Sequence, residues 1–365
     1  MFNKIEVDLN AITNNVRVFR NMIDAETKII GVVKANAYGH GLIDTARAIW
    51  TSGADILATF DIEEAVSLRV AKIRCPILII GYVEPRDYRR LLDFDLTVTI
   101  FELDDAIKLN QEATKQNKWA KVDIKVDTGM NRFGVSPFEA VEFYQKVSAL
   151  EHIKITGIHS HFADAGDQEF SREQIRRMQG VLFGLQQFGT SAPMVHMAAT
   201  QGTFKYPEAH FDAVRVGLGL YGYYDFEVEE KLLLPALEFR TQIAQIKRVG
   251  KGESVGYKRT FEAEKPLKIA VLPCGYSDGY PRDLSNKSQV LVHGKRARLI
   301  GRVCMNVFMI DVTGINCSVG DDVILIGSQG GGKVDADDLA QLTGSIPHEI
   351  LSRLNPNIHR EYHFK

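Results

Sequence analysis

The chain has few cysteines, almost no net charge and no long hydrophobic segment. Its four cysteines, Cys75, Cys274, Cys304 and Cys317, are irregularly spaced without a C-x-x-C motif, which argues against a disulfide framework and a zinc site. Lys and Arg number 44 against 46 Asp and Glu, so no global basic field exists to bind nucleic acid or anionic lipid. No stretch approaches the roughly 18 apolar residues of a membrane span, and residues 1–10 lack a signal-peptide core. These absences predict a soluble, cytoplasmic protein without nucleic acid or membrane partners.

The composition is that of an ordinary globular protein, with 45% hydrophobic and 25% charged residues. Between about residues 27 and 217, short β-branched runs alternate with longer segments of helical periodicity, and several runs are continuously apolar, as in strands covered on both faces. The runs expected as strands are 28–33, 54–60, 76–80, 95–100, 121–126, 153–159, 193–197 and 212–216. Eight such strands with intervening helices predict a closed parallel (β/α)8 barrel of the TIM type. An open doubly wound sheet is the alternative that strand counting leaves open.

Two of the intervening segments, residues 61–73 and 136–150, place apolar residues at helical spacing. In the second of them, Ser136 followed by Pro137 predicts an N-cap with proline at the first helical position. The sequence therefore predicts a helix that begins at Ser136.

Beyond residue 235 the chain changes to successive short strands with turn-rich joints. The expected strands are 236–249, 267–273, 288–293, 297–303, 307–312 and 322–327, and a short helix is expected at 335–343. This pattern predicts a mostly antiparallel β domain at the C-terminus. We place the barrel domain at residues 1–230 and the β domain at residues 231–365, with residues 3–9 as a strand that can pair with the second domain.

Polar and cationic residues follow several of the expected barrel strands, where catalytic groups stand in such barrels. They are Lys34, Lys125, Arg132, His161, His196, Thr200, Arg215 and Gly217. Each alone has a structural interpretation, such as a solvated lysine, a hydrogen-bonded core histidine or a turn glycine. His159 and His161, two residues apart, could form a metal pair, but histidines in a barrel more often have a structural role, so we expect no metal site from them. The convergence of the set on one face favours an active site.

The segment VVKANAYGHG at residues 32–41 resembles the pyridoxal-phosphate lysine motif of alanine racemases. The resemblance continues in order along nearly the whole chain, through KVDTGMNRFGV, HSHFADA, VRVGLGLYG, VGYKRTF, LPCGYSDGYPR, GRVCMN and the C-terminal REY. It implies an N-terminal barrel, a C-terminal β domain, pyridoxal 5'-phosphate as cofactor, and a homodimer whose active sites are shared between subunits. A fold alone establishes no activity, so the matching residues are considered individually.

Racemisation requires a carbanion at the Cα atom of an amino acid, and pyridoxal phosphate held by a lysine supplies the electron sink. By the resemblance, Lys34 holds the cofactor and moves the proton on the D-face, while Tyr257 from the other subunit serves the L-face. A phenol is a weak acid, so neighbouring positive charge must favour its ionised form. Arg215 matches an arginine that faces the pyridine nitrogen; because a guanidinium keeps its proton, the sink stays weak, which disfavours decarboxylation.

The remaining matches concern the cofactor, the substrate and the entrance. Those expected at the cofactor are His161 and His196 beside the ring, and Tyr38, Thr200, Gly217 and Leu218 around the phosphate. Those expected near the substrate are Arg132, the backbone of Met305 from the other subunit, Lys125 as a lysine that the family often carries carbamylated, and Tyr276 with Arg302 at the entrance.

The sequence departs from the family pattern at three places. Ala199-Thr200 stands where Asn-Ser is usual, and Asn306 replaces an aspartate. Asn355-Pro356-Asn357 stands where Ser-Tyr-Arg is usual, so the tyrosine that ordinarily narrows the entrance and contacts the phosphate is absent. The leading hypothesis is an alanine racemase that supplies D-alanine for peptidoglycan. The alternatives are a racemase of serine or larger amino acids, and a non-catalytic pyridoxal-phosphate carrier, against which Tyr257 in a second domain argues.

Overall fold

The computed structural model describes residues 2–190, 192–224, 226–227 and 232–364. The chain forms two compact units, which we call the barrel unit and the β unit. The barrel unit comprises Ile12–Ala35 and Leu42–Leu234, and the β unit comprises Met1–Ala11, Asn36–Gly41 and Pro235–Lys365. The short segment Asn36–Gly41, which directly follows the barrel's first strand, thus belongs to the β unit. The expected boundary between residues 230 and 231 lies outside the described residues.

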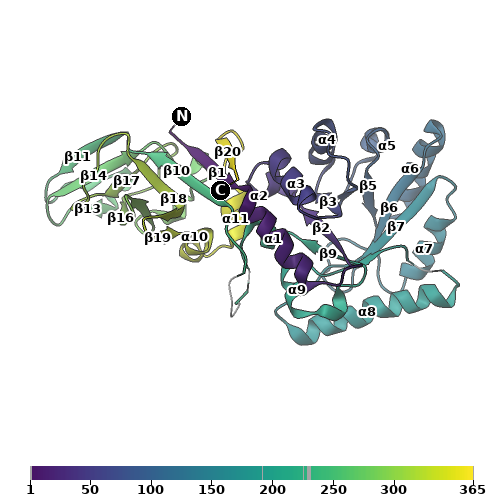
Figure 1. Cartoon of the computed structure of the whole chain (residues 1–365). Helices are drawn as coiled ribbons and strands as arrows, with labels where there is room; N and C mark the ends of the chain where they lie inside the picture. The colour runs from purple at the N-terminus through teal and green to yellow at the C-terminus, as the bar shows by residue number, and fades with distance from the viewer. Residues whose placement is uncertain (1, 191, 225, 228–231, 365) are drawn as a thin grey trace. The chain divides into compact units, whose positions relative to one another are not determined.

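The barrel unit is a closed ring of eight parallel strands (Figure 1). In order around the ring these are β2 (Lys28–Val32), β3 (Ile56–Thr59), β4 (Ile77–Ile79), β5 (Thr97–Ile100), β6 (Ala120–Lys125), β7 (Ile153–His159), β8 (Val195–His196) and β9 (Ala213–Val216). Pairing of β9 with β2 closes the ring, with Lys28 opposite Ala213. The predicted barrel is therefore confirmed, and the open-sheet alternative is wrong.

Helices follow most of the barrel strands, and α3 to α8 lie outside them in Figure 1. The helices are α1 (Leu9–Met22), α3 (Leu42–Thr51), α4 (Ile62–Val70), α5 (Tyr88–Asp93), α6 (Leu103–Gln116), α7 (Ala140–Ser148), α8 (Gln168–Gln187) and α9 (Thr200–Lys205), with 3-10 turns η1 (Pro85–Asp87), η2 (Pro207–Ala209) and η3 (Leu218–Tyr221). Asp61 and Asp167 cap α4 and α8 by accepting a backbone N–H in the first turn. None of the helices in the described part of the chain could cross a membrane.

The expected start of α7 at Ser136 is wrong, because this helix begins at Ala140. The Ser136 side chain does accept a bond from the Phe138 N–H, and its carbonyl accepts from the Glu139 N–H. These short-range bonds form a separate turn, and the helix follows it.

The β unit contains one large sheet in the order β11-β14-β17-β16-β15-β18-β10-β1-β20, with β19 paired to β18 and a separate pair β12-β13. Its strands are β1 (Lys4–Asp8), β10 (Leu237–Gln242), β11 (Gln245–Val249), β12 (Ser254–Val255), β13 (Phe261–Glu262), β14 (Leu267–Leu272), β15 (Gln289–Val292), β16 (Lys295–Ile300), β17 (Phe308–Asp311), β18 (Asp322–Gln329), β19 (Gly332–Val334) and β20 (His359–His363). The N-terminal strand β1 pairs antiparallel with β10 and parallel with β20. The two ends of the chain therefore join one sheet.

The expected strand at residues 236–249 is two strands, β10 and β11, because the chain changes partners between them. β10 pairs with β18, whereas β11 pairs with β14. At the join, the Ile243 N–H bonds to the Asp321 carbonyl and the Ala244 N–H to that of Val271. The remaining helical elements of this unit are η4 (Tyr257–Arg259), η5 (Tyr276–Asp278), η6 (Arg282–Leu284), α10 (Ala336–Thr343) and α11 (Pro347–Ser352). α10 was expected, and α11 was missed.

Candidate active site

Lys34 follows the carboxyl end of β2 and begins an unusual turn, α2 (Lys34–Tyr38). The four residues after Lys34 all have φ between 51° and 56°, which makes this a left-handed turn built without glycine. Such a conformation costs about 1–2 kcal/mol per L-residue, and it persists only where the surroundings impose it. Strained backbone of this kind clusters at functional sites, which makes Lys34 a candidate functional residue.

The end of this turn is anchored within the β unit. Gly39 has φ +82°, and a Cβ atom there would overlap the carbonyl oxygen of Leu351 at the end of α11. The Arg360 Nε also donates to the Gly39 carbonyl at 2.9 Å. Leu351 therefore lies beside this segment, and the same Arg360 guanidinium also donates to the Pro356 carbonyl at 3.0 Å.

Lys34 belongs to a cluster of cations in the barrel unit. Its pKa is lowered from the usual lysine value, first by burial and then by the charges of Arg132 and Arg215, with Glu64 opposing them. Lys125, at the end of β6, is buried, and its pKa is lowered to about 8 by burial and then by Arg215 and Arg132. Because these cations destabilise one another, the cluster is suited to an anionic ligand.

Arg215 on β9 is buried and holds a fixed orientation. Its Nη1 lies 2.6 Å from His196 Nδ1, and its Nη2 lies 3.0 Å from His161 Nδ1 and donates to the Ser160 carbonyl at 2.6 Å. Burial lowers the pKa of Arg215 to about 10, against the opposing charge of Asp123, so the guanidinium stays charged at neutral pH. The two histidine nitrogens must therefore act as acceptors.

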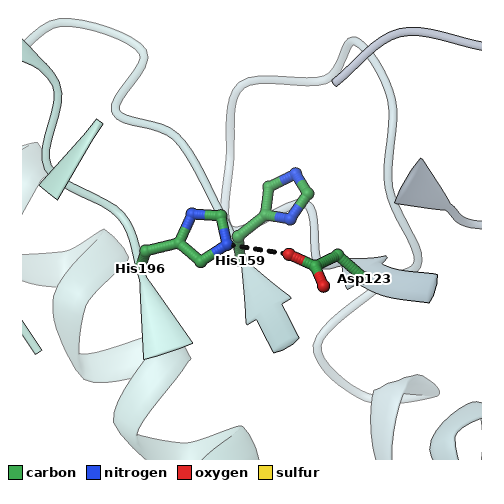
Figure 2. Close-up of side chains that lie close together, drawn as sticks. All are labelled: Asp123, His159 and His196. Atoms are coloured by element: carbon green, nitrogen blue, oxygen red, sulfur yellow. Dashed lines mark hydrogen bonds and ion pairs between the residues drawn. The ribbon is translucent and has the colours of Figure 1, made fainter. Parts of the chain in front are cut away.

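The hydrogen-bond chain continues from His196 into the barrel interior (Figure 2). His196 Nε2 lies 3.1 Å from Asp123 Oδ2, and the His159 ring stacks on His196 with centroids 4.8 Å apart. Burial lowers the pKa of His196 to about 4, so its imidazole is neutral near pH 7. Sequence reasoning missed Asp123, although an aspartate inside the apolar strand 120–125 was a signal for it.

Asp123, His159 and His196 also have the composition of a metal site, and their ligand atoms lie within 4.8 Å of one another. However, both nitrogens of His196 already have partners, Arg215 and Asp123. The pKa of His159 is held well below its usual value by burial and then by His196, Arg215 and Lys125, which shows that the surroundings disfavour added positive charge. The contacts therefore connect Asp123 and His196 to Arg215, and His159 stacks on His196.

The loop after β9 packs tightly against the start of α9. The Gly219 N–H donates to Thr200 Oγ1 at 3.2 Å, and a Cβ at Gly219 would press against the Phe19 ring and lie 2.9 Å from Thr200 Cγ2. Gly217 and Leu218 open the turn η3 beside this contact. The structure thus brings the Thr200 hydroxyl together with the backbone expected to bind a phosphate. Tyr38, the other expected phosphate ligand, is part of the β unit, where its ring centroid lies 5.8 Å from that of His348.

The other expected residues, Tyr257, Tyr276, Arg302 and Met305, belong to the β unit. Tyr257 is 71% exposed and Met305 56% exposed. The Tyr276 N–H donates to the Cys304 carbonyl at 3.1 Å, and the Ser277 N–H to the Met305 carbonyl at 3.0 Å. Tyr276 and Met305 therefore lie on adjoining loops, which present large side chains to solvent.

The fold and the site define an enzyme of the barrel class, with a partly buried lysine and an oriented arginine at one end of the strands. Residues 7–225 match the N-terminal domain of alanine racemase, and residues 236–362 match its C-terminal domain. The chain is 41% identical to the alanine racemase of Halothermothrix orenii, over 98% of this chain and 96% of that one.

Solved structures agree with this match. The alanine racemase of Bacillus anthracis with bound L-Ala-P has a TM-score of 0.93 at 32% identity, covering 99% of this chain and 94% of that one. The Bartonella henselae enzyme with covalently bound pyridoxal phosphate has a TM-score of 0.89 at 27% identity, covering 99% of both chains. The chain belongs to the alanine racemase family and is an amino-acid racemase.

Proposed function

We propose that this protein interconverts L-alanine and D-alanine with pyridoxal 5'-phosphate, in the cytoplasm, and so supplies D-alanine for peptidoglycan. The observation that carries the proposal is the cation cluster around Lys34, in which Arg215 is fixed by two histidines. A lysine with a lowered pKa has more of the neutral amine that attacks an aldehyde carbon. The cations suit the phosphate of the cofactor and the carboxylate of the substrate, and the Thr200 hydroxyl adds a phosphate ligand.

When bound, pyridoxal phosphate supplies an electron sink for the Cα atom of the substrate. Lys34 Nζ then accepts or returns the Cα proton on one face, and the partner subunit's Tyr257 does the same with its hydroxyl on the other face. Arg132 holds the substrate carboxylate, which keeps Cα between the two groups. The charged Arg215, which keeps its protons near pH 7, keeps the sink weak and favours return of the proton to Cα.

The proposed homodimer accounts for the exposed side chains of the β unit. Tyr257, Met305 and Tyr276 are 71%, 56% and 43% exposed in the single chain. Aromatic and methionine side chains are enriched at protein interfaces, and a catalytic tyrosine needs surroundings that control its proton. A second subunit that covers these loops would bury the exposed side chains and would surround the Tyr257 hydroxyl.

The direct test is a racemisation assay over all proteinogenic amino acids, with and without added pyridoxal phosphate, in which both enantiomers are quantified. Alanine should be the best substrate, and turnover should depend on the cofactor. A protein that binds the cofactor but racemises no amino acid would instead support the carrier alternative.

Lys125 should carry a carbamate in bicarbonate buffer. With a pKa lowered to about 8, its neutral fraction at pH 7 is roughly two orders of magnitude above that of an ordinary lysine. The lysine releases one proton to become neutral, and its Nζ then forms a bond to the carbon of CO2 and releases a second proton. Together these two steps convert a cation into an anion beside Arg132 and Arg215. Carbon-13 NMR in labelled bicarbonate should show a carbamate carbonyl that weakens as the pH falls through about 8.

This signal should disappear in Lys125→Ala and persist in Lys121→Ala. Lys121 lies four residues earlier on the same strand, and its side chain pairs with Asp95. A wild-type protein without the signal at saturating bicarbonate would rule out the modification.

Pro356 should leave the entrance wide, because it stands where the family pattern has a tyrosine. Pro356→Tyr should therefore lower kcat/KM for serine and larger substrates by about tenfold relative to alanine, since small steric changes in a pocket discriminate by roughly 10–200-fold. The variant should also hold the cofactor more tightly. A wild-type protein as selective for alanine as Pro356→Tyr would show that the wide-entrance hypothesis is wrong.

A further inference from the structure

The hydrogen-bond chain in the barrel interior determines where His196 carries its proton. A guanidinium offers only donors, so His196 Nδ1, 2.6 Å from Arg215 Nη1, must be an acceptor. The neutral ring therefore holds its single proton on Nε2, which lies 3.1 Å from Asp123 Oδ2. The Asp123 carboxylate is the acceptor that favours this tautomer.

The Asp123 side chain is buried and is held by a second hydrogen bond. It is 1% exposed, and its other oxygen accepts a 2.6 Å bond from Thr156 Oγ1. Without the carboxylate, the Nε2–H group of His196 would lose its acceptor in a buried environment, which is costly. The other tautomer would then compete, and its Nδ1–H would face the N–H group of Arg215. Either change would disturb the orientation of Arg215.

We propose that Asp123 is a positioning residue that fixes the tautomer of His196 and, through it, the orientation of Arg215. The inference rests on the proposed function for the catalytic consequence, but the tautomer itself is a property of the protein alone. Asp123 touches neither the substrate nor the reacting atoms in this scheme. It acts by keeping His196 Nδ1 unprotonated, so that this nitrogen can accept the hydrogen bond from Arg215.

A cavity borders Asp123. It has a volume of about 340 Å3, and its wall includes Asp123 and Thr156. It lies toward the amino-terminal ends of the strands, because its lining includes Lys28, the first residue of β2, whereas Lys34 follows the other end of that strand. The cations on its wall are Lys28, Arg69, Arg74 and Lys121. Removing the Asp123 carboxylate would extend this cavity toward His196, and the cations would attract a small carboxylate into the space.

The experiment is chemical rescue with formate. The imidazole nitrogen-15 signals of His196 are identified in the cofactor-free protein by their loss in His196→Gln. In Asp123→Ala these signals should move away from the pattern of the Nε2–H tautomer. The same substitution should also lower kcat by about ten- to hundredfold with little change in KM, the range for losing a hydrogen bond to a charged group. Added formate should restore both the NMR pattern and kcat in a saturable manner.

Three controls sharpen this test. Chloride at matched ionic strength should not rescue, because it lacks the carboxylate shape. Asp123→Asn should keep the Nε2–H tautomer, since its amide oxygen can still accept. Asp95 lies on the same cavity wall, but its carboxylate pairs with Lys121 and not with His196. Asp95→Ala should therefore leave the tautomer and kcat unchanged.

An unchanged tautomer and unchanged kcat in Asp123→Ala would overturn the proposal. The proposal would also be overturned if formate failed to restore the activity of Asp123→Ala and Asp123→Asn were equally impaired. That pattern would indicate a purely structural role for Asp123. If the wild-type protein proves inactive as a racemase, the NMR measurements still decide the role of Asp123, so the two failures are distinguishable.

Discussion

Replacing Lys34 with alanine is expected to abolish racemisation and covalent retention of the cofactor. The side chain is proposed both to hold pyridoxal phosphate and to move the Cα proton on one face, so its loss removes two contributions at once. General acid–base catalysis alone contributes roughly 10²–10⁴-fold, and kcat should therefore fall by at least about three orders of magnitude. Borohydride reduction followed by peptide mass spectrometry should find the cofactor on the Lys34 peptide of the wild type.

The matched control is Lys154→Ala, which removes an exposed lysine from the barrel strand β7. It should keep full activity and the same cofactor adduct. The assignment of Lys34 would be wrong if the Lys34→Ala protein still formed a reducible adduct at full occupancy. A folded Lys34→Ala protein, shown by an unchanged unfolding temperature, is needed for either conclusion, because the strained turn follows this residue directly.

The eight strands were predictable because they are short β-branched runs that alternate with helical segments, whereas closure into a barrel rather than an open sheet could not be decided by counting strands. The cationic residues near the strand ends could also be predicted, since Lys34 directly follows the run 28–33 and Lys125 and Arg215 stand near the ends of the runs 121–126 and 212–216. The sequence could not predict the left-handed turn, because Ala35, Asn36, Ala37 and Tyr38 carry no glycine to signal positive φ. The segment is held by residues far along the chain, since the Leu351 carbonyl oxygen leaves no room for a Cβ at Gly39 and Arg360 donates to the Gly39 carbonyl.

Contacts between distant positions explain the other omissions. Asp123 and His196 are 73 residues apart, and nothing local in either strand shows that they meet. The failed helix start at Ser136 has a different cause, since a serine and a proline can also form the turn that precedes a helix. Local sequence patterns thus predicted the strands, most helices and the cationic residues near the strand ends. The buried contacts of Arg215 could not be predicted in this way, because they form only when the barrel closes.

Two inactive variants are expected to restore activity when mixed, if the active site is shared between subunits. Lys34→Ala lacks the lysine, and Tyr257→Phe keeps the aromatic ring but lacks the hydroxyl that moves the second proton. In a dimer formed from one copy of each, one site combines the intact Lys34 with the partner subunit's intact Tyr257, and the other site has neither. Random subunit exchange makes about half of the dimers mixed, so activity should reach about a quarter of the wild-type value by symmetry counting.

The exposure of Tyr257, 71% in the single chain, is the structural reason to expect this result, because a residue so exposed can enter a partner's site. Mixing Lys34→Ala with a Lys34→Ala/Tyr257→Phe double variant provides the control, since no pairing of those chains contains an intact lysine, and activity should stay absent. Native mass spectrometry of the mixture measures the mixed dimers independently of activity. Persistent inactivity in a sample where mixed dimers are abundant would mean that both groups act within one chain, and the proposed exchange of Tyr257 between subunits would then have to be abandoned.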